Sequence, residues 1–278
     1  MLIAVPLICM FQRKPTAQVT QSSFLESIIQ LTPAMPKPPP EVIALYEAQA
    51  KDRAAMFEEA VQRDEAYVQP KHVLLPLVPE VWCPSLIRIG HVGDGGKWIC
   101  NPWAAPKDCV AYSLGSNNDI SFEKELQRLT ENRCLLRTVD SAVATPDVAQ
   151  SLLAMRGIYV QAKVANKTES AKKQFRLDDI MDSRGDGEME ILKMDVDGAE
   201  VDVILQFLAI HRPCQILVEL HKPKTMPHLL RSFAKSGYYL LSFEVNTVKI
   251  ATGYTEFSFI HKYCTAKYGA KLLAQYLL

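Results

Sequence analysis

Residues 191–200, Ile-Leu-Lys-Met-Asp-Val-Asp-Gly-Ala-Glu, combine acidic side chains with a glycine in a pattern suited to ligand binding or acid–base chemistry. The pattern predicts a buried strand that ends at Asp195 and Asp197, turns at Gly198 and continues into an amphipathic helix. In an open α/β sheet, ligands bind outside the carboxyl ends of the strands. We therefore expect these carboxylates to lie at the edge of a ligand site.

The elements that must position this tip alternate along the chain. Apolar runs typical of strands are separated by helical patterns, which favours βαβ units and a mostly parallel sheet. Only a loop separates the last two runs, so these two can form an antiparallel pair. This is the outline of a Rossmann-like methyltransferase fold: an α/β, mostly parallel seven-stranded sheet with helices on both faces and an N-terminal helical extension. The predicted strands are 110–114, 135–139, 158–160, 191–194, 216–220, 238–243 and 257–260.

The ends of the first two predicted strands carry residues that suit a nucleoside. Gly115, followed by Ser116, Asn117 and Asp119, lets a cofactor approach the backbone beside a helix N-terminus. Asp140, which ends the second strand, can accept hydrogen bonds from both hydroxyls of a ribose. An ordinary capped loop would explain the same residue types. The chain lacks G-x-G-x-x-G at this turn, which argues against a dinucleotide. S-adenosylmethionine, with a ribose and no phosphate, fits this pattern.

Several segments resemble the FkbM-type methyltransferases. These are KMDVDGAE, ILVELH, SGYYLLSFEVN and the preceding R-L-D-D-I. The upstream segments R-I-G, D-G-G-K-W-I-C and Y-S-L-G-S-N-N-D-I-S-F-E resemble a group of animal methyltransferase-like proteins with N-terminal signal anchors. The resemblance covers residues 81–263. Two positions depart from the wider pattern: Ser113 stands where many methyltransferases have an acid, and Asp119 where FkbM-type members have a second glycine.

The resemblance implies methyl transfer from S-adenosylmethionine to an oxygen, on a small-molecule, glycan or lipid hydroxyl. Asp195 would face the methionine moiety of the cofactor or the acceptor. Glu219 and His221 end the neighbouring strand and are the candidate catalytic bases. Asp195 is the third candidate catalytic residue. An imidazole has an unperturbed pKa of about 6.5, a suitable range for a base, although a single histidine at a strand end is also common as an ordinary loop residue.

A divalent cation is the alternative use of the same side chains. Asp195, Asp197, Glu219 and His221 offer the oxygen and nitrogen ligands that Mg²⁺ or Mn²⁺ takes. Carboxylates at a helix start, such as Asp197 and Glu200, also stabilise the helix dipole without any metal. We expect no metal.

The remaining regions define the domain organisation. Residues 1–12 are apolar and typical of a signal peptide or a truncated membrane anchor, 13–40 form a proline-rich linker, and 41–70 an amphipathic helix. The methyltransferase domain is placed at 81–263, followed by a C-terminal helix at 264–278. The 31 basic residues equal the 31 acidic residues, so no global positive field favours a nucleic acid, and we expect no nucleic-acid partner.

The cysteines and one glycosylation motif bear on the compartment. None of the seven cysteines forms a C-x-x-C motif, which argues against a zinc site. Cys109 and Cys134 begin neighbouring predicted strands; we favour buried free thiols there, whereas a disulfide would suit a secretory lumen. The number of cysteines, the apolar N-terminus and the sequon at Asn166 together favour the secretory pathway, in the lumen of the ER or Golgi, secreted or attached to the membrane by the N-terminus. The cytoplasm is the alternative.

Two other classes of function compete with the enzymatic interpretation. A methyltransferase fold can serve as a binding or scaffold protein without catalysis, since fold does not fix function. A nicotinamide-dependent oxidoreductase can use a similar sheet, but the glycine pattern argues against it.

Overall fold

The structure is a computed structural model that describes residues 36–246, 248 and 252–278. Lys37–Leu278 form one compact unit. The predicted signal or anchor at 1–12 lies outside the described residues, as does nearly all of the predicted linker at 13–40.

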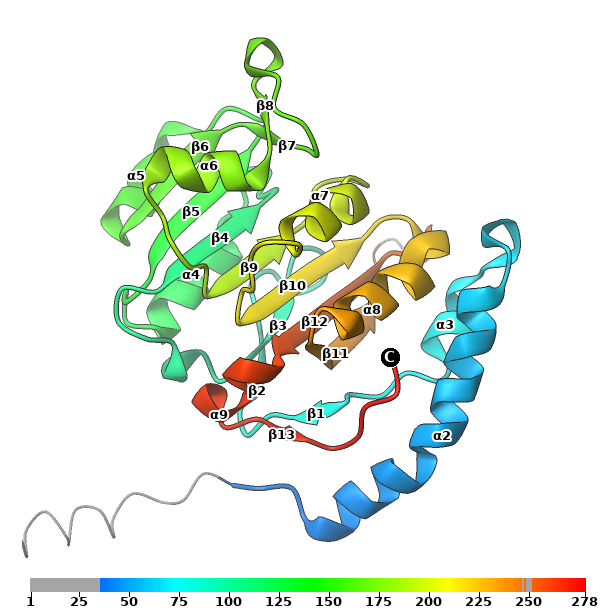
Figure 1. Ribbon diagram of the computed structural model, residues 1–278. Coiled ribbons are helices and arrows are strands. Elements are labelled where there is room, and N and C mark those ends of the chain that lie inside the picture. Colours follow the sequence, from blue (N-terminus) through cyan, green and yellow to red (C-terminus); the bar gives the residue numbers. More distant parts are fainter. Residues whose placement is uncertain (1–35, 247, 249–251) are drawn as a thin grey trace, which may run out of the picture. The chain divides into compact units, whose positions relative to one another are not determined.

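A seven-stranded sheet forms the centre of this unit (Figure 1). Its strand order is β11-β12-β10-β9-β4-β5-β6. β12 is antiparallel to both of its neighbours, and the remaining pairs are parallel. The mostly parallel sheet with an antiparallel terminal pair is therefore confirmed. The strands are β4 (Val110–Leu114), β5 (Leu135–Asp140), β6 (Gly157–Gln161), β9 (Ile191–Met194), β10 (Gln215–Leu220), β11 (Tyr238–Val245) and β12 (Thr255–His261).

Helices cover both faces of the sheet. One apolar core joins α2, α3, α6, α7 and α8 to the sheet, and α7 and α8 lie in front of it in Figure 1. A second core joins α4 and α5 to the opposite face, where Phe122 and Leu126 of α4 pack. The helices are α2 (Pro40–Gln62), α3 (Pro70–Leu74), α4 (Ser121–Leu129), α5 (Pro146–Ala154), α6 (Leu177–Arg184), α7 (Glu200–Phe207), α8 (Met226–Lys235) and α9 (Thr265–Tyr268).

Three small two-stranded sheets accompany the central one. β2 and β3 form a hairpin whose turn contains Asp94-Gly95-Gly96, and β3 lies against β10 and β12. Gln215 at the start of β10 fixes β3, because its side-chain amide accepts from the N–H of Cys100 (2.8 Å) and donates to its carbonyl (2.8 Å). The small sheets pair β1 (Val81–Trp82) with β13 (Lys271–Leu272), β2 (Leu86–Ile89) with β3 (Lys97–Cys100), and β7 (Lys163–Val164) with β8 (Gln174–Phe175).

Six cysteines form disulfides. Cys109 and Cys134 precede the adjacent strands β4 and β5, which places their Cα atoms 4.4 Å apart, and the two are joined. The expectation of free thiols at this pair is therefore wrong. The other bridges join Cys83 to Cys100 and Cys214 to Cys264.

Two predicted helices are shorter than expected. The helix predicted for 41–70 ends at Gln62 and is followed by a separate short helix, α3. The helix predicted for 264–278 is wrong beyond Tyr268. Gly269 adopts a left-handed conformation (φ 70°) that ends α9, as glycines after helices commonly do. The chain then enters β13, which pairs with β1 instead of continuing as a helix.

The last residues of the chain are held by a buried carboxylate. Glu80, fully buried, accepts backbone N–H groups of Tyr276 (2.8 Å), Leu277 (3.1 Å) and, from β11, Leu240 (3.1 Å). Tyr276 and Leu277 are themselves buried among core residues of the sheet. The C-terminal segment is thus part of the core of the domain.

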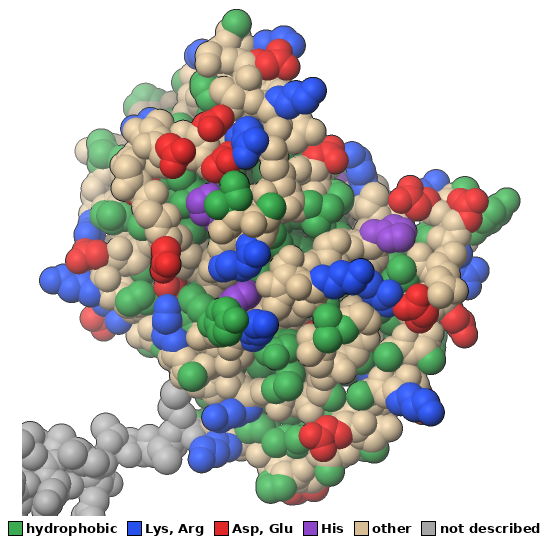
Figure 2. Space-filling view, in the orientation of Figure 1, with side chains coloured by type: hydrophobic (Ala, Val, Ile, Leu, Met, Phe, Trp, Pro, Cys, Tyr) green, Lys and Arg blue, Asp and Glu red, His purple; other side chains and the backbone are tan. Residues whose placement is uncertain are grey.

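The surface shows no dominant sign of charge in the view of Figure 2, where basic and acidic side chains of the described residues are interspersed. This agrees with the equal numbers of the two kinds in the sequence. Within the described part of the chain, no helix combines the length and the apolar character needed to cross a bilayer.

Candidate active site

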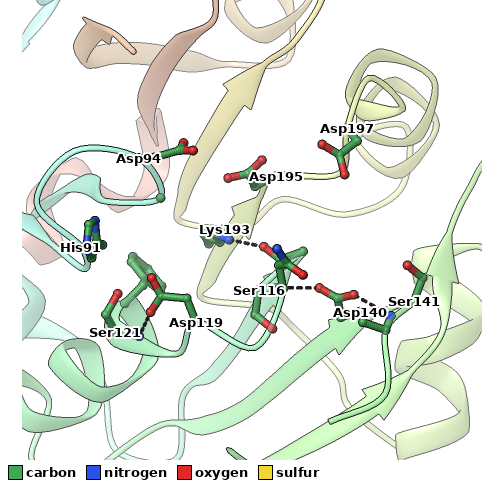
Figure 3. A pocket seen from close by; sticks show the side chains of 15 residues that line it. His91, Asp94, Ser116, Asp119, Ser121, Asp140, Ser141, Lys193, Asp195 and Asp197 are labelled. Atoms are coloured by element: carbon green, nitrogen blue, oxygen red, sulfur yellow. Dashed lines mark hydrogen bonds between the residues drawn. The ribbon is translucent and has the colours of Figure 1, made fainter. Parts of the chain in front are cut away.

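A polar cavity of about 500 Å³ opens at the carboxyl ends of the central strands (Figure 3). Its size lies in the usual range for small-molecule sites. Its walls come from the loops after β4, β5 and β9 and from the β2–β3 turn. The predicted residues that line it are Gly115, Ser116, Asn117, Asp119, Asp140 and Asp195, and it is also lined by His91, Asp94, Gly95, Ser121, Phe122, Ser141, Ala142, Lys193 and Asp197.

Gly115 allows two backbone segments to meet at the floor of this cavity. A Cβ atom added there would lie 1.6 Å from the carbonyl oxygen of Asp195, and the φ angle is +75°. Both conditions require glycine. Lys193 reinforces the same junction, because its Nζ donates to the Gly115 carbonyl at 2.6 Å. The turn after β4 is therefore fastened directly to the end of β9.

Asp140 organises the neighbouring loop. Its two carboxylate oxygens accept the backbone N–H groups of Asn117 (2.7 Å) and Ala142 (2.8 Å). An ionised carboxylate has further lone pairs, so it retains acceptor capacity toward the cavity. Asp119 caps the start of α4 by accepting from the N–H of Ser121 (2.9 Å). The predicted cofactor residues thus lie together. Asp140 and Asp119 also accept backbone N–H groups of their loops, as the capped-loop alternative expects.

His221 follows β10, and its ring is held between carboxylates. Nδ1 lies 2.8 Å from Oε1 of Glu200, and Nε2 lies 3.6 Å from Oδ1 of Asp195. Glu200 is itself fixed, since the same oxygen accepts the N–H of Gly198 at 2.9 Å. In the neutral ring, Nδ1–H donates to Glu200 and the lone pair of Nε2 faces Asp195. This is the arrangement of a base with an orienting carboxylate.

The charges around His221 set the protonation of the cluster. Burial alone would lower the pKa of His221, but the hydrogen bond and the charge of Glu200 outweigh burial and raise it. Burial favours a higher pKa for Asp195, but the nearby lysines and His221 lower it overall. Burial and the charge of Asp195 raise the pKa of Glu219. Asp195 therefore gives up its proton at a lower pH than Glu219 does.

A buried lysine lies behind Asp195. Lys97 of β3 is fully buried, with Nζ 2.7 Å from Oε1 of Glu256 and 3.5 Å from Oδ2 of Asp195. Burial opposes its charge, but Glu256 and Asp195 outweigh burial and raise the pKa of Lys97. Lys97 therefore remains an ammonium ion next to the predicted catalytic residues.

Three of the four residues considered as cation ligands lie close together. Single ligand atoms of Asp195, Glu219 and His221 all lie within 4.8 Å of one another, which is close enough to surround a metal ion. The side chain of Asp197 is 97% exposed and is not one of these three, although its Oδ1 lies 3.7 Å from Nε2 of His221. The residue types suit Mg²⁺ or Mn²⁺.

Sequence reasoning missed three members of this cluster. Glu200 was assigned to the helix dipole, although it orients His221. Lys97 and Glu256 were not singled out, because nothing in their local sequence shows that the side chains are buried against each other. The one available signal concerns Glu256, which lies opposite Glu219 when β12 pairs with β10.

The sheet order and the cavity at the strand ends are those of the Rossmann-like methyltransferase fold. A family model described as a methyltransferase domain matches residues 48–261. The chain belongs to this methyltransferase domain family, for which S-adenosylmethionine is the expected cofactor.

Solved structures of methyltransferases are similar in fold. Fibrillarin of Aeropyrum pernix, with natively bound S-adenosyl-L-methionine, has 12% identity and a TM-score of 0.39 over 62% of this chain and 82% of that one. The 1,6-didemethyltoxoflavin-N1-methyltransferase of Burkholderia thailandensis, with S-adenosylhomocysteine, has 11% identity and a TM-score of 0.35 over 82% and 93%. At these TM-scores the similarities carry no argument about the reaction. Comparison with curated protein sequences gives no match.

The residues present fit the expected cofactor. Asp140 offers free acceptor capacity toward a ribose, and the hydroxyl of Ser116 is buried with no hydrogen-bond partner beside the same loop. Asp195 and Asp197 add negative charge for a ligand that carries a sulfonium. Gly115, Ser116, Asn117, Asp119 and Asp140 are the residues that would hold the cofactor.

Proposed function

We propose that this chain is an S-adenosylmethionine-dependent O-methyltransferase that acts on an uncharged hydroxyl of a small molecule, glycan or lipid. The proposal rests chiefly on His221, whose Nε2 faces Asp195 at the ends of β9 and β10 while Glu200 holds Nδ1 at 2.8 Å. A positioned base is what an oxygen nucleophile needs, because a neutral alcohol must lose its proton as it is methylated.

The chemistry divides simply between ligand and protein. The cofactor supplies a methyl group on a positively charged sulfur. That sulfur would keep the bonding electrons as the methyl group left for the acceptor oxygen, and Nε2 of His221 would take the hydroxyl proton. Asp195, ionised and 3.6 Å from Nε2, stabilises the imidazolium that results. Glu200, through its contact with Nδ1, keeps Nε2 turned toward Asp195.

The charge of the cavity supports an uncharged acceptor. Asp94, Asp195 and Asp197 follow one another along one side of it in Figure 3. Lys193 also lines the cavity, but its Nζ already donates to the carbonyl of Gly115. Carboxylates accept hydrogen bonds from hydroxyl groups and repel phosphate, sulfate and carboxylate groups. A neutral, hydroxyl-rich acceptor such as a sugar matches this lining.

A place in the secretory pathway, with N-terminal membrane attachment, belongs to the same proposal. The three disulfides are of the kind that persists in oxidising compartments. Asn166 of the sequon is exposed, so an oligosaccharide could be attached there. These features also support the signal-anchored, FkbM-like subgroup. A glycosidase-sensitive mass shift that Asn166→Gln abolishes would test the location.

The direct test is release of S-adenosylhomocysteine by the full chain against panels of glycans, lipids and small hydroxylated metabolites. Calorimetry with S-adenosylmethionine comes first, because it distinguishes a chain that binds no cofactor from one that binds it without methylating the acceptor. No binding would favour a scaffold protein on this fold. Binding with release of S-adenosylhomocysteine that depends on a hydroxylated acceptor, and that His221→Ala abolishes, is the expected result. Methylation of nitrogen or carbon in the product would overturn the choice of oxygen.

A further inference from the structure

The cluster at the end of β10 has the ligands of a divalent cation but also contains a fixed positive charge. Asp195, Glu219 and His221 bring ligand atoms within 4.8 Å of one another. Lys97 lies against the same cluster, with Nζ 3.5 Å from Oδ2 of Asp195. A carboxylate oxygen turned toward an ammonium ion is less available to a metal, and the ammonium repels any second cation placed nearby.

Lys97 is held there by the fold. It is fully buried, and Oε1 of Glu256 accepts from Nζ at 2.7 Å. The strand that carries it is fixed just after Lys97: the hydroxyl of Ser258 donates to the carbonyl of Trp98 (2.7 Å), and Cys100 forms a disulfide with Cys83. A buried lysine held this firmly cannot swing away to admit an ion.

We propose that Lys97 is a positioning residue that serves as the built-in cation of this site. Its ammonium lies 3.5 Å from Oδ2 of Asp195, where it supplies the positive charge that Mg²⁺ or Mn²⁺ would bring to the cluster and orients this carboxylate beside His221. The cluster is therefore a divalent-cation site that one lysine has closed. This inference deepens the proposed function, but it concerns metal binding and can be tested without an acceptor.

The test measures Mn²⁺ binding to the full chain by calorimetry or by the electron paramagnetic resonance signal of free Mn²⁺. The key protein is the double variant Lys97→Met with Glu256→Gln, which removes both members of the buried pair. Losing both partners together avoids an unpaired buried charge, so the variant is expected to fold. We expect its Mn²⁺ affinity to rise at least tenfold over the wild type, and Asp195→Asn in the same background to reverse the gain.

Two controls keep the result interpretable. Lys172→Met with Glu169→Gln removes an exposed ion pair and should leave Mn²⁺ binding unchanged. Lys97→Arg keeps the positive charge and should bind Mn²⁺ no better than the wild type. The proposal is overturned if the key variant gains no affinity, or if the wild type already binds Mn²⁺ in a manner that Asp195→Asn abolishes. The second outcome can be observed even if every Lys97 variant fails to fold.

Discussion

The two sides of the cavity are built from different kinds of chemical groups. The cofactor side, after β4 and β5, consists of a glycine turn, backbone N–H groups and one aspartate, Asp140, that holds two of them. The proposed acceptor side begins at Asp195, after β9, and behind this carboxylate the charged side chains of His221 and Lys97 are largely removed from water. Backbone geometry therefore governs binding on one side, and a balance of buried charges governs chemistry on the other.

Gly115 connects the two sides, so a substitution at this residue should affect both. Gly115→Ala would place a Cβ atom 1.6 Å from the carbonyl oxygen of Asp195 at a positive φ. We expect a loss of about 3 kcal/mol in the free energy of unfolding and no measurable cofactor binding. Urea denaturation and calorimetry measure the two effects. Gly187→Ala is the control, since a Cβ there meets no atom within 4 Å; equal losses in both variants would contradict the argument.

His221 tests the acceptor side alone. His221→Ala should leave cofactor affinity nearly unchanged and lower turnover by about 100-fold or more, as removal of a general base does. His228→Ala on α8 is the matched control. A His221 variant with weakened cofactor binding and normal turnover would place this residue on the other side of the cavity.

Asp140 tests the cofactor side alone. Asp140→Ala removes a carboxylate that also orders two backbone N–H groups, so we expect cofactor affinity to fall by about 10- to 100-fold, in keeping with the cost of losing hydrogen bonds to a charged group. Turnover at saturating cofactor should change much less. Asp147→Ala, in the first turn of α5, serves as control. Unchanged affinity would remove the ribose assignment.

The smallest effect is the pH dependence. Glu200 raises the pKa of His221 above its ordinary 6.5, and a base must be unprotonated, so turnover should fall as the pH drops through that raised value. Stability follows the opposite sign. The contribution of the protonated ring is complete below the unfolded pKa and is lost as the pH rises through the folded one. Glu200→Gln should move the turnover profile toward lower pH; a profile that stays in place would separate Glu200 from the base.

The sequence predicted the frame and the cofactor side better than the acceptor side. Each central strand, Gly115 and Asp140 could be located because periodicity and turn residues are local signals. Lys97 and Glu256 could not, since their burial depends on a hairpin folding over strands more than 100 residues away. The helix predicted for 264–278 failed for a similar reason. The apolar residues after Gly269 bury themselves by packing and by pairing with β1, and tertiary contacts override a helical pattern.

The position of Glu80 beneath the final residues has a consequence for how this protein is made. The carboxylate of Glu80 receives its backbone partners from Tyr276 and Leu277, so an acidic group within the core stays uncompensated until synthesis of those residues is complete. Domains that close on contacts distant in sequence fold slowly. A chain that lacks residues 276–278 would thus expose both the acid and its apolar surroundings, so we expect such a truncation to destabilise the whole domain.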